Sequence, residues 1–166
     1  MALFSEVPMN EIKKVYLDYQ SRTSVELLKY LMKEYWGINP EIIQATNDDY
    51  RRQISGTTGG LVIGDRALEQ RKVSTFIYDL GSEWRSITGL PFVFAAWVST
   101  KKLPDDFIRQ FNEANAKGLQ HIDEIASGEV FDLYDLKKYY TLHLSYLLDE
   151  RKRKGMELFL QVISTI

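Results

Sequence analysis

Four consecutive residues have side chains suited to binding an anion: Ser21, Arg22, Thr23 and Ser24. The three hydroxyls can donate hydrogen bonds, and the guanidinium is a charged fork that fits a carboxylate. These residues lie between a predicted strand over 13–18 and a predicted helix, whose free amides and positive end also favour an anion. The same residues also fit a plain helix N-cap beside a surface arginine, and both interpretations stay open.

A second candidate turn, Ile63-Gly64-Asp65-Arg66-Ala67, follows a predicted buried strand over 61–64. Gly64 allows a ligand to come close to the backbone. Asp65 can orient a polar group of a substrate or act as a base. Alternatively, Asp65 caps the next helical turn and pairs locally with Arg66.

Other common chemical motifs do not occur in this sequence. The glycine-rich stretch over 56–60 lacks the Gly-Lys-Ser/Thr ending of a P-loop and does not match GxGxxG, so it is predicted to be a connection. The chain has no cysteine, and His121 and His143 are 22 positions apart without a metal-binding spacing. The residues therefore show no recognised zinc motif or nucleotide-binding loop.

Alternating strands and helices would position the two turns. Strands are predicted over 13–18, 41–45, 61–64 and 75–79, and the segments between them have helical patterns. This alternation predicts an α/β fold with a mostly parallel sheet. In such sheets ligands bind beyond the carboxyl ends of the strands, so we expect residues 21–24 and 64–65 to share one hollow.

The pattern changes after residue 90. The segment 91–100 is the most apolar of the chain, and we expect it to run through more than one layer of the structure. From Pro104 onward the sequence predicts helices only, beginning with an apolar stripe that includes Phe107 and Phe111.

Charge and hydropathy exclude two classes of partner. The 166 residues include 21 Lys and Arg against 23 Asp and Glu, without the basic excess typical of nucleic-acid binding. No apolar run approaches the roughly 20 residues that a membrane span needs. The first residues lack the pattern of a signal peptide, so a cytoplasmic protein without membrane association is expected.

Four sequence blocks resemble the MqnA family of menaquinone biosynthesis, the chorismate dehydratase of the futalosine route. They are Ser21–Val25, Leu61–Leu68, Asp79–Arg85 and Thr88–Ala95 with Trp97. The last block is more similar to the dehydratase than to the dihydroxynaphthoate synthase of the same pathway. The resemblance implies a type II periplasmic-binding-protein-like fold in a cytoplasmic enzyme, without a metal or an organic cofactor.

The implied reaction removes water from chorismate to give 3-[(1-carboxyvinyl)oxy]benzoate. Chorismate is a dicarboxylate, so we expect Ser21, Arg22, Thr23, Ser24 and Gly64 to bind it. Asp65 is the candidate catalytic residue, although a carboxylate of the substrate can itself accept the proton. The alternative hypothesis is a module of the same fold that binds a small carboxylate without catalysis.

Family members carry a substantial portion before the equivalent of Ala2, and this part is expected to form most of a first lobe. We therefore expect one complete lobe over 7–90, a crossover strand over 91–100, and helices over 101–166 that return to a truncated first lobe. A second copy of the chain or a complementing N-terminal chain is the expected macromolecular partner.

Overall fold

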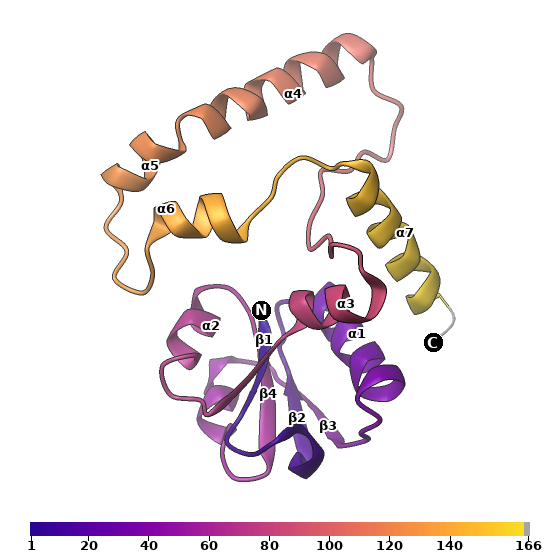
Figure 1. Cartoon of the computed structure of the whole chain (residues 1–166), viewed down its shortest axis with the longest axis vertical. Coiled ribbons are helices and arrows are strands. Elements are labelled where there is room, and N and C mark those ends of the chain that lie inside the picture. Colours follow the sequence, from indigo (N-terminus) through magenta and orange to yellow (C-terminus); the bar gives the residue numbers. More distant parts are fainter. Residues whose placement is uncertain (165–166) are drawn as a thin grey trace. The chain divides into compact units, whose positions relative to one another are not determined.

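The structure is a computed structural model that describes residues 1–164 (Figure 1). It divides into two compact units. Unit 1 comprises Met1–Phe94 and Leu148–Ile166, and unit 2 comprises Ala95–Leu147.

Unit 1 contains one five-stranded sheet in the order β3-β2-β4-β1-β5. The strands are β1 (Ala2–Ser5), β2 (Lys14–Leu17), β3 (Glu41–Gln44), β4 (Thr58–Val62) and β5 (Phe76–Asp79). β2 pairs in parallel with both β3 and β4, whereas β1 is antiparallel to β4 and β5. The predicted α/β class with a mostly parallel sheet is confirmed. The sequence prediction missed β1, which is fully buried and lies outside the predicted lobe.

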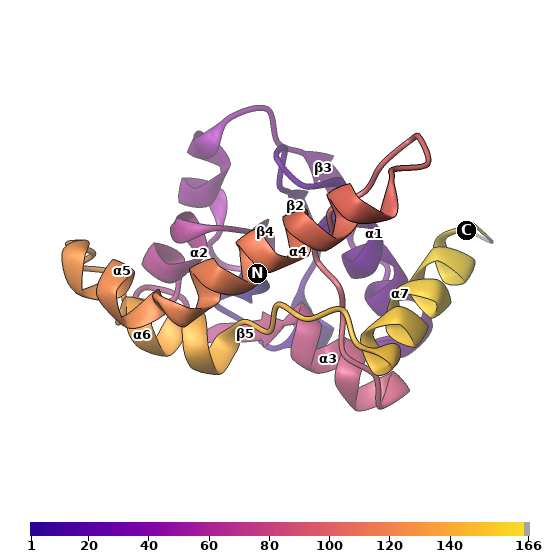
Figure 2. The same cartoon turned by 90° about the horizontal axis from the view of Figure 1, so that it is seen from above.

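Helical segments cover both faces of this sheet. They are η1 (Met9–Glu11), α1 (Arg22–Tyr30), its π-helical continuation η2 (Leu31–Tyr35), η3 (Asp48–Gln53), α2 (Asp65–Gln70), α3 (Leu80–Thr88) and α7 (Glu150–Ile163). Figures 1 and 2 both show α2 on one side of the strands and α1 with α7 on the other.

Alternating side chains of the strands build two cores. Leu3, Val15 and Leu61 point to the side of α1, α3 and α7, where they join the larger apolar cluster. Phe4 and Val62 point to the opposite side, where η3 and α2 cover them. A strand buried on both faces reads as a continuous apolar run, as Leu61 and Val62 do in the sequence.

The structure corrects the predicted crossover strand over 91–100. No residue of this segment forms a strand. The Phe92 side chain of this segment packs on helices instead. The Phe92 ring lies 5.5 Å from Trp84 and 4.8 Å from Phe159.

The helical tail also divides differently from the prediction of one return segment over 101–166. Helix α7 belongs to unit 1, because Phe159 on its apolar face is buried in the same cluster as Trp84. The Arg151 guanidinium also donates a 2.8 Å hydrogen bond to the carbonyl of Gly89. Only the segment before α7 forms a separate unit.

Unit 2 consists of α4 (Asp105–Gln120), α5 (Ile122–Gly128), α6 (Leu136–Lys138) and the π-helical η4 (Tyr139–His143). The predicted helix after Pro104 is confirmed. None of residues 95–147 is buried, and large apolar side chains such as Trp97 and Leu147 are 82% and 75% exposed. These helices therefore form no core of their own.

A glycine in α7 provides a sharp test of how this helix packs. A Cβ added at Gly155 would collide with the carbonyl oxygen of Pro91. Alanine normally stabilises a helix interior by up to about 1 kcal/mol relative to glycine. We expect Gly155→Ala to do the opposite and to lower the free energy of unfolding by roughly 1–3 kcal/mol.

Urea denaturation followed by circular dichroism measures this effect. Gly118→Ala in α4 is the matched control, because a Cβ there has no atom within 4 Å. It should be neutral or stabilising. A stabilising Gly155→Ala substitution would show that α7 does not pack on the Pro91 backbone.

Candidate functional site at the carboxyl edge of the sheet

The two turns singled out in the sequence lie at one edge of the sheet. The Ser21–Ser24 turn follows β2, and the Gly64–Asp65 turn follows β4, which is the parallel neighbour of β2. Because β1 is antiparallel, its first residue reaches the same edge, where Ala2 pairs with Val62 and Asp79. The fold therefore places both candidate turns at the same edge of the sheet.

The two serine hydroxyls of the first turn form hydrogen bonds with other groups of the protein. Ser21 is the N-cap of α1, and its Oγ accepts a 3.1 Å hydrogen bond from the Ser24 amide. The Ser21 hydroxyl donates to Ser24 Oγ at 2.6 Å, and Ser24 Oγ in turn donates to the sulfur of Met1 at 2.8 Å. The capping interpretation is thus correct for these two residues.

Other donors of the same turn remain available to a ligand. Arg22 is exposed, and neither its guanidinium nor the Thr23 hydroxyl has a partner among the described residues. The backbone amides of these two residues also lack an acceptor within residues 1–164, as expected for the first turn of a helix. A carboxylate at this position would meet a cation, a hydroxyl and two amides.

The second turn is shaped by Gly64, whose φ of 63° lies in the left-handed region that favours glycine. A Cβ at this position would meet no atom within 4 Å, so this side of the backbone is open. Asp65 is exposed and begins α2. The alternative, in which Asp65 caps the next helical turn and pairs with Arg66, is wrong. Gly64 is the N-cap of α2, and Arg66 pairs with Asp18 and Asp48.

A buried ion pair that the sequence did not reveal joins the two turns. Asp18 is only 1% exposed, and its Oδ2 accepts a 2.9 Å hydrogen bond from Arg66 Nη2. Its Oδ1 accepts from the Gln20 amide at 2.8 Å. The Tyr50 hydroxyl lies 2.9 Å from Asp18 Oδ2 and 2.8 Å from the Leu61 carbonyl, and it shares one proton between them.

Arg66 makes further contacts with the residues that lead into the first turn. Its Nη2 donates to Gln20 Oε1 at 2.8 Å, and its Nη1 pairs with Asp48. The guanidinium lies 5.3 Å from the centroid of the Tyr19 ring, within the range of a cation–π contact. Arg66 thus contacts three consecutive residues of the segment between β2 and α1, namely Asp18, Tyr19 and Gln20.

Burial and charge keep Tyr50 neutral and Arg66 charged. Burial, followed by the charge of Asp18, raises the pKa of the Tyr50 hydroxyl, which therefore remains a donor. Burial alone would lower the pKa of the Arg66 guanidinium. The hydrogen bonds that Arg66 donates to Asp48 and Asp18, together with the charge of Asp18, outweigh burial and raise this pKa, so Arg66 stays charged.

The chain matches a family model described as menaquinone biosynthesis over residues 1–165. It belongs to this menaquinone-biosynthesis family. The resemblance drawn from the four sequence blocks is thereby confirmed.

Two curated relatives carry the name chorismate dehydratase. The protein from Thermus thermophilus is 29% identical over 183 residues, which cover 97% of this chain and 66% of the relative. The protein from Campylobacter jejuni is 26% identical over 113 residues, which cover 65% of this chain and 50% of the relative. The chain thus spans between half and two thirds of the length of these relatives.

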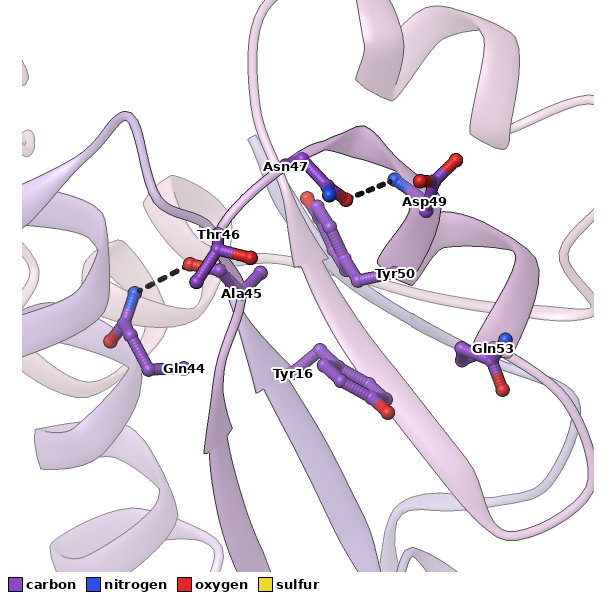
Figure 3. A pocket seen from close by; sticks show the side chains of 8 residues that line it. All are labelled: Tyr16, Gln44, Ala45, Thr46, Asn47, Asp49, Tyr50 and Gln53. Atoms are coloured by element: carbon purple, nitrogen blue, oxygen red, sulfur yellow. Dashed lines mark hydrogen bonds between the residues drawn. The ribbon is translucent and has the colours of Figure 1, made fainter.

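Unit 1 of this menaquinone-biosynthesis family member also has an open hollow of about 260 Å³ (Figure 3). It is lined by residues of β2, of the end of β3 and of η3: Tyr16, Gln44, Ala45, Thr46, Asn47, Asp49, Tyr50 and Gln53. None of these residues belongs to either candidate turn. The hollow is therefore not the one that residues 21–24 and 64–65 were expected to share.

Within residues 1–164, no helix is long and apolar enough to cross a membrane. The same residues contain no cluster of three or more histidine or carboxylate side chains that could hold a metal ion.

Proposed function

We propose that this chain is a chorismate dehydratase that converts chorismate to 3-[(1-carboxyvinyl)oxy]benzoate and water. Three observations support the proposal: membership of the menaquinone-biosynthesis family, two relatives named chorismate dehydratase, and the free anion-binding groups of the turn after β2. The last of these carries most weight because it rests on this chain alone.

The reaction is an elimination. The C–O bond to the ring hydroxyl breaks, and the neighbouring ring carbon loses its proton. The electron pair of that C–H bond forms the double bond that makes the ring aromatic. Aromatisation supplies much of the driving force, so the protein mainly has to align the hydroxyl and the proton and exclude water.

Each turn has a distinct role in this proposal. Arg22 and Thr23 bind one substrate carboxylate with their side chains and amides. Ser21 and Ser24 hold these donors in place by capping α1. Gly64 lets the substrate approach the backbone. Asp65, which is exposed at the same edge, positions the substrate or accepts its proton.

The proposal extends to the architecture and setting of the enzyme. We propose that unit 1 is one lobe of a type II periplasmic-binding-protein-like fold, and that the chain acts in the cytoplasm. The exposed apolar side chains of unit 2 would be covered by a complementing N-terminal portion or by a second copy of the chain.

Incubation with chorismate tests the activity. Mass spectrometry would follow the loss of substrate and the appearance of the enol-ether benzoate. The assay is run with the chain alone and with the part of the Thermus thermophilus relative that the chain does not match. Saturable binding with chorismate recovered intact in both cases would favour a carboxylate-binding module. If chorismate is neither converted nor bound in both assays, the assignment is refuted.

Removing the free cation of the first turn should weaken substrate binding. A hydrogen bond to a charged group contributes about 1.5–3 kcal/mol, so we expect Arg22→Ala to raise the Kd for chorismate by roughly 10-fold to 100-fold. Isothermal titration calorimetry measures the change. Arg85→Ala is the matched control, because Arg85 is also exposed but lies in the last turn of α3. Equal Kd values for Arg22→Ala and the unmodified chain would exclude Arg22 from the site.

A further inference from the structure

The candidate site residues lie where β2 leads into α1 and where β4 leads into α2. Arg66 and Asp18 join these two places, although they are 48 positions apart in the sequence. A substrate held by both needs them at a fixed separation, since a displacement of about 1 Å can cost on the order of 100-fold in rate. Any contact that joins the two segments therefore bears on the site.

We propose that Arg66 is a positioning residue that fixes the Ser21–Ser24 turn against the Gly64–Asp65 turn by gripping the buried carboxylate of Asp18. This inference rests on the proposed function, because it assigns a purpose to the arrangement of that site. Arg66 itself need not touch the substrate.

The geometry of the ion pair supports this role. Arg66 is the second residue of α2, two positions after Gly64, and Asp18 lies three positions before Ser21. The side chains of Arg66 and Asp18 are 15% and 0% exposed, so water screens the pair only weakly. Arg66 Nη2 reaches both Asp18 oxygens, at 2.9 and 3.2 Å, and also Gln20 Oε1 at 2.8 Å.

Two further contacts make the connection rigid. Asp18 Oδ1 accepts from the Gln20 amide, which fixes the backbone directly before Ser21. Tyr50 bridges Asp18 to the Leu61 carbonyl on β4. A lysine at position 66 would keep the positive charge, but its single ammonium group cannot reproduce the planar fork that reaches Asp18, Gln20 and Asp48 together.

Arg66→Lys is therefore the informative variant. It leaves Asp18 with a counter-charge, so the fold should be retained, while the two turns lose their fixed separation. We expect kcat/KM for chorismate, or 1/Kd if only binding is measured, to fall on the order of 10-fold to 100-fold. Glu69→Gln is the matched control. It removes the ion pair between Glu69 on α2 and Arg51 on η3, which involves no residue of either turn, and should leave these values unchanged.

Amide hydrogen exchange in the free protein gives a readout that does not depend on the ligand. The Gln20 and Ser24 amides are bonded to Asp18 and Ser21 in one segment, and the Ala67 amide is bonded to Gly64 in the other. In Arg66→Lys all three amides should exchange at least about 10-fold faster, whereas core amides of β4 should not change.

The outcomes separate the two proposals. If the unmodified chain binds chorismate and Arg66→Lys binds it equally well, Arg66 is not a positioning residue. Unchanged exchange at all three amides in a folded Arg66→Lys variant would likewise overturn the inference, whether or not chorismate binds. If the unmodified chain neither binds nor converts chorismate, the proposed function fails, and the exchange rates alone show whether Arg66 joins the turns.

If the Arg66→Lys variant does not fold, the inference can be tested on the unmodified chain instead. Titration with chorismate should shift the amide resonances of Gln20, Thr23 and Arg66 along one saturation curve, because the two segments respond as one body. A shift at Thr23 with no change at Gln20 and Arg66 would overturn the inference.

Discussion

Trp84→Ala is expected to lower the free energy of unfolding of unit 1 by about 3–5 kcal/mol. The Trp84 side chain is fully buried. Its ring lies 6.0 Å from Tyr30 on α1, 5.5 Å from Phe92 and 5.9 Å from Phe159 on α7. Truncation to alanine would leave a cavity where three segments of the chain converge on α3. Such a cavity removes the contacts that fasten α7 to the rest of the unit.

Urea denaturation followed by far-ultraviolet circular dichroism measures the loss. Trp97→Ala is the matched control, because Trp97 is 82% exposed and belongs to unit 2. Its substitution should change the unfolding of unit 1 by no more than about 0.5 kcal/mol. A Trp84→Ala variant with the same unfolding midpoint as the unmodified chain would contradict the packing described for α7 and the segment before unit 2.

Arg66→Gln should destabilise unit 1 by a comparable amount, about 3–5 kcal/mol, because it leaves the Asp18 carboxylate buried without a counter-charge. The cost comes from the unpaired charge rather than from the lost hydrogen bonds alone. The remaining donors to Asp18, the Gln20 amide and the Tyr50 hydroxyl, are neutral and cannot replace the guanidinium.

A double substitution separates charge from packing in this cluster. Asp18→Asn combined with Arg66→Gln removes both charges and should recover much of the stability that Arg66→Gln loses. Glu69→Gln breaks a more exposed ion pair of the same helix and should cost at most about 1 kcal/mol. Equal urea midpoints for Arg66→Gln and Glu69→Gln would mean that burying Asp18 without Arg66 does not lower the stability of unit 1.

Local patterns were sufficient to predict β2, β3, the end of β4 and the two turns that follow β2 and β4. The prediction of a connection over 56–60 was wrong for Thr58–Gly60, which belong to β4. Leu61 and Val62 are apolar because both faces of β4 are covered, and Ser21 caps a helix whose apolar stripe was visible in the sequence. In an α/β sheet these facts already place the two turns at one edge. The α/β class and the neighbourhood of the candidate site were therefore predictable.

Features that depend on distant contacts could not be predicted in this way. Asp18 ends a strand and Tyr50 lies in a polar segment, and neither sequence position indicates that the two side chains meet in the interior. The segment 91–100 has the composition of a buried strand, but a strand also needs a neighbour with which to pair. The sequence predicted that Phe159 belongs to an apolar stripe of a helix, but it did not predict which surface this stripe covers.

The placement of β1 has a consequence for how the chain folds during synthesis. β1 is made before its partners β4 and β5, whose residues follow more than 50 positions later. Since β5 joins the sheet through β1, an emerging chain can pair β2 with β3 while β1 is still without its partners. Such long-range pairing slows folding and leaves Ala2–Ser5, an apolar and β-prone stretch, open to pairing with other chains. Nascent copies of this protein are therefore expected to need protection from a chaperone until residue 79 has emerged.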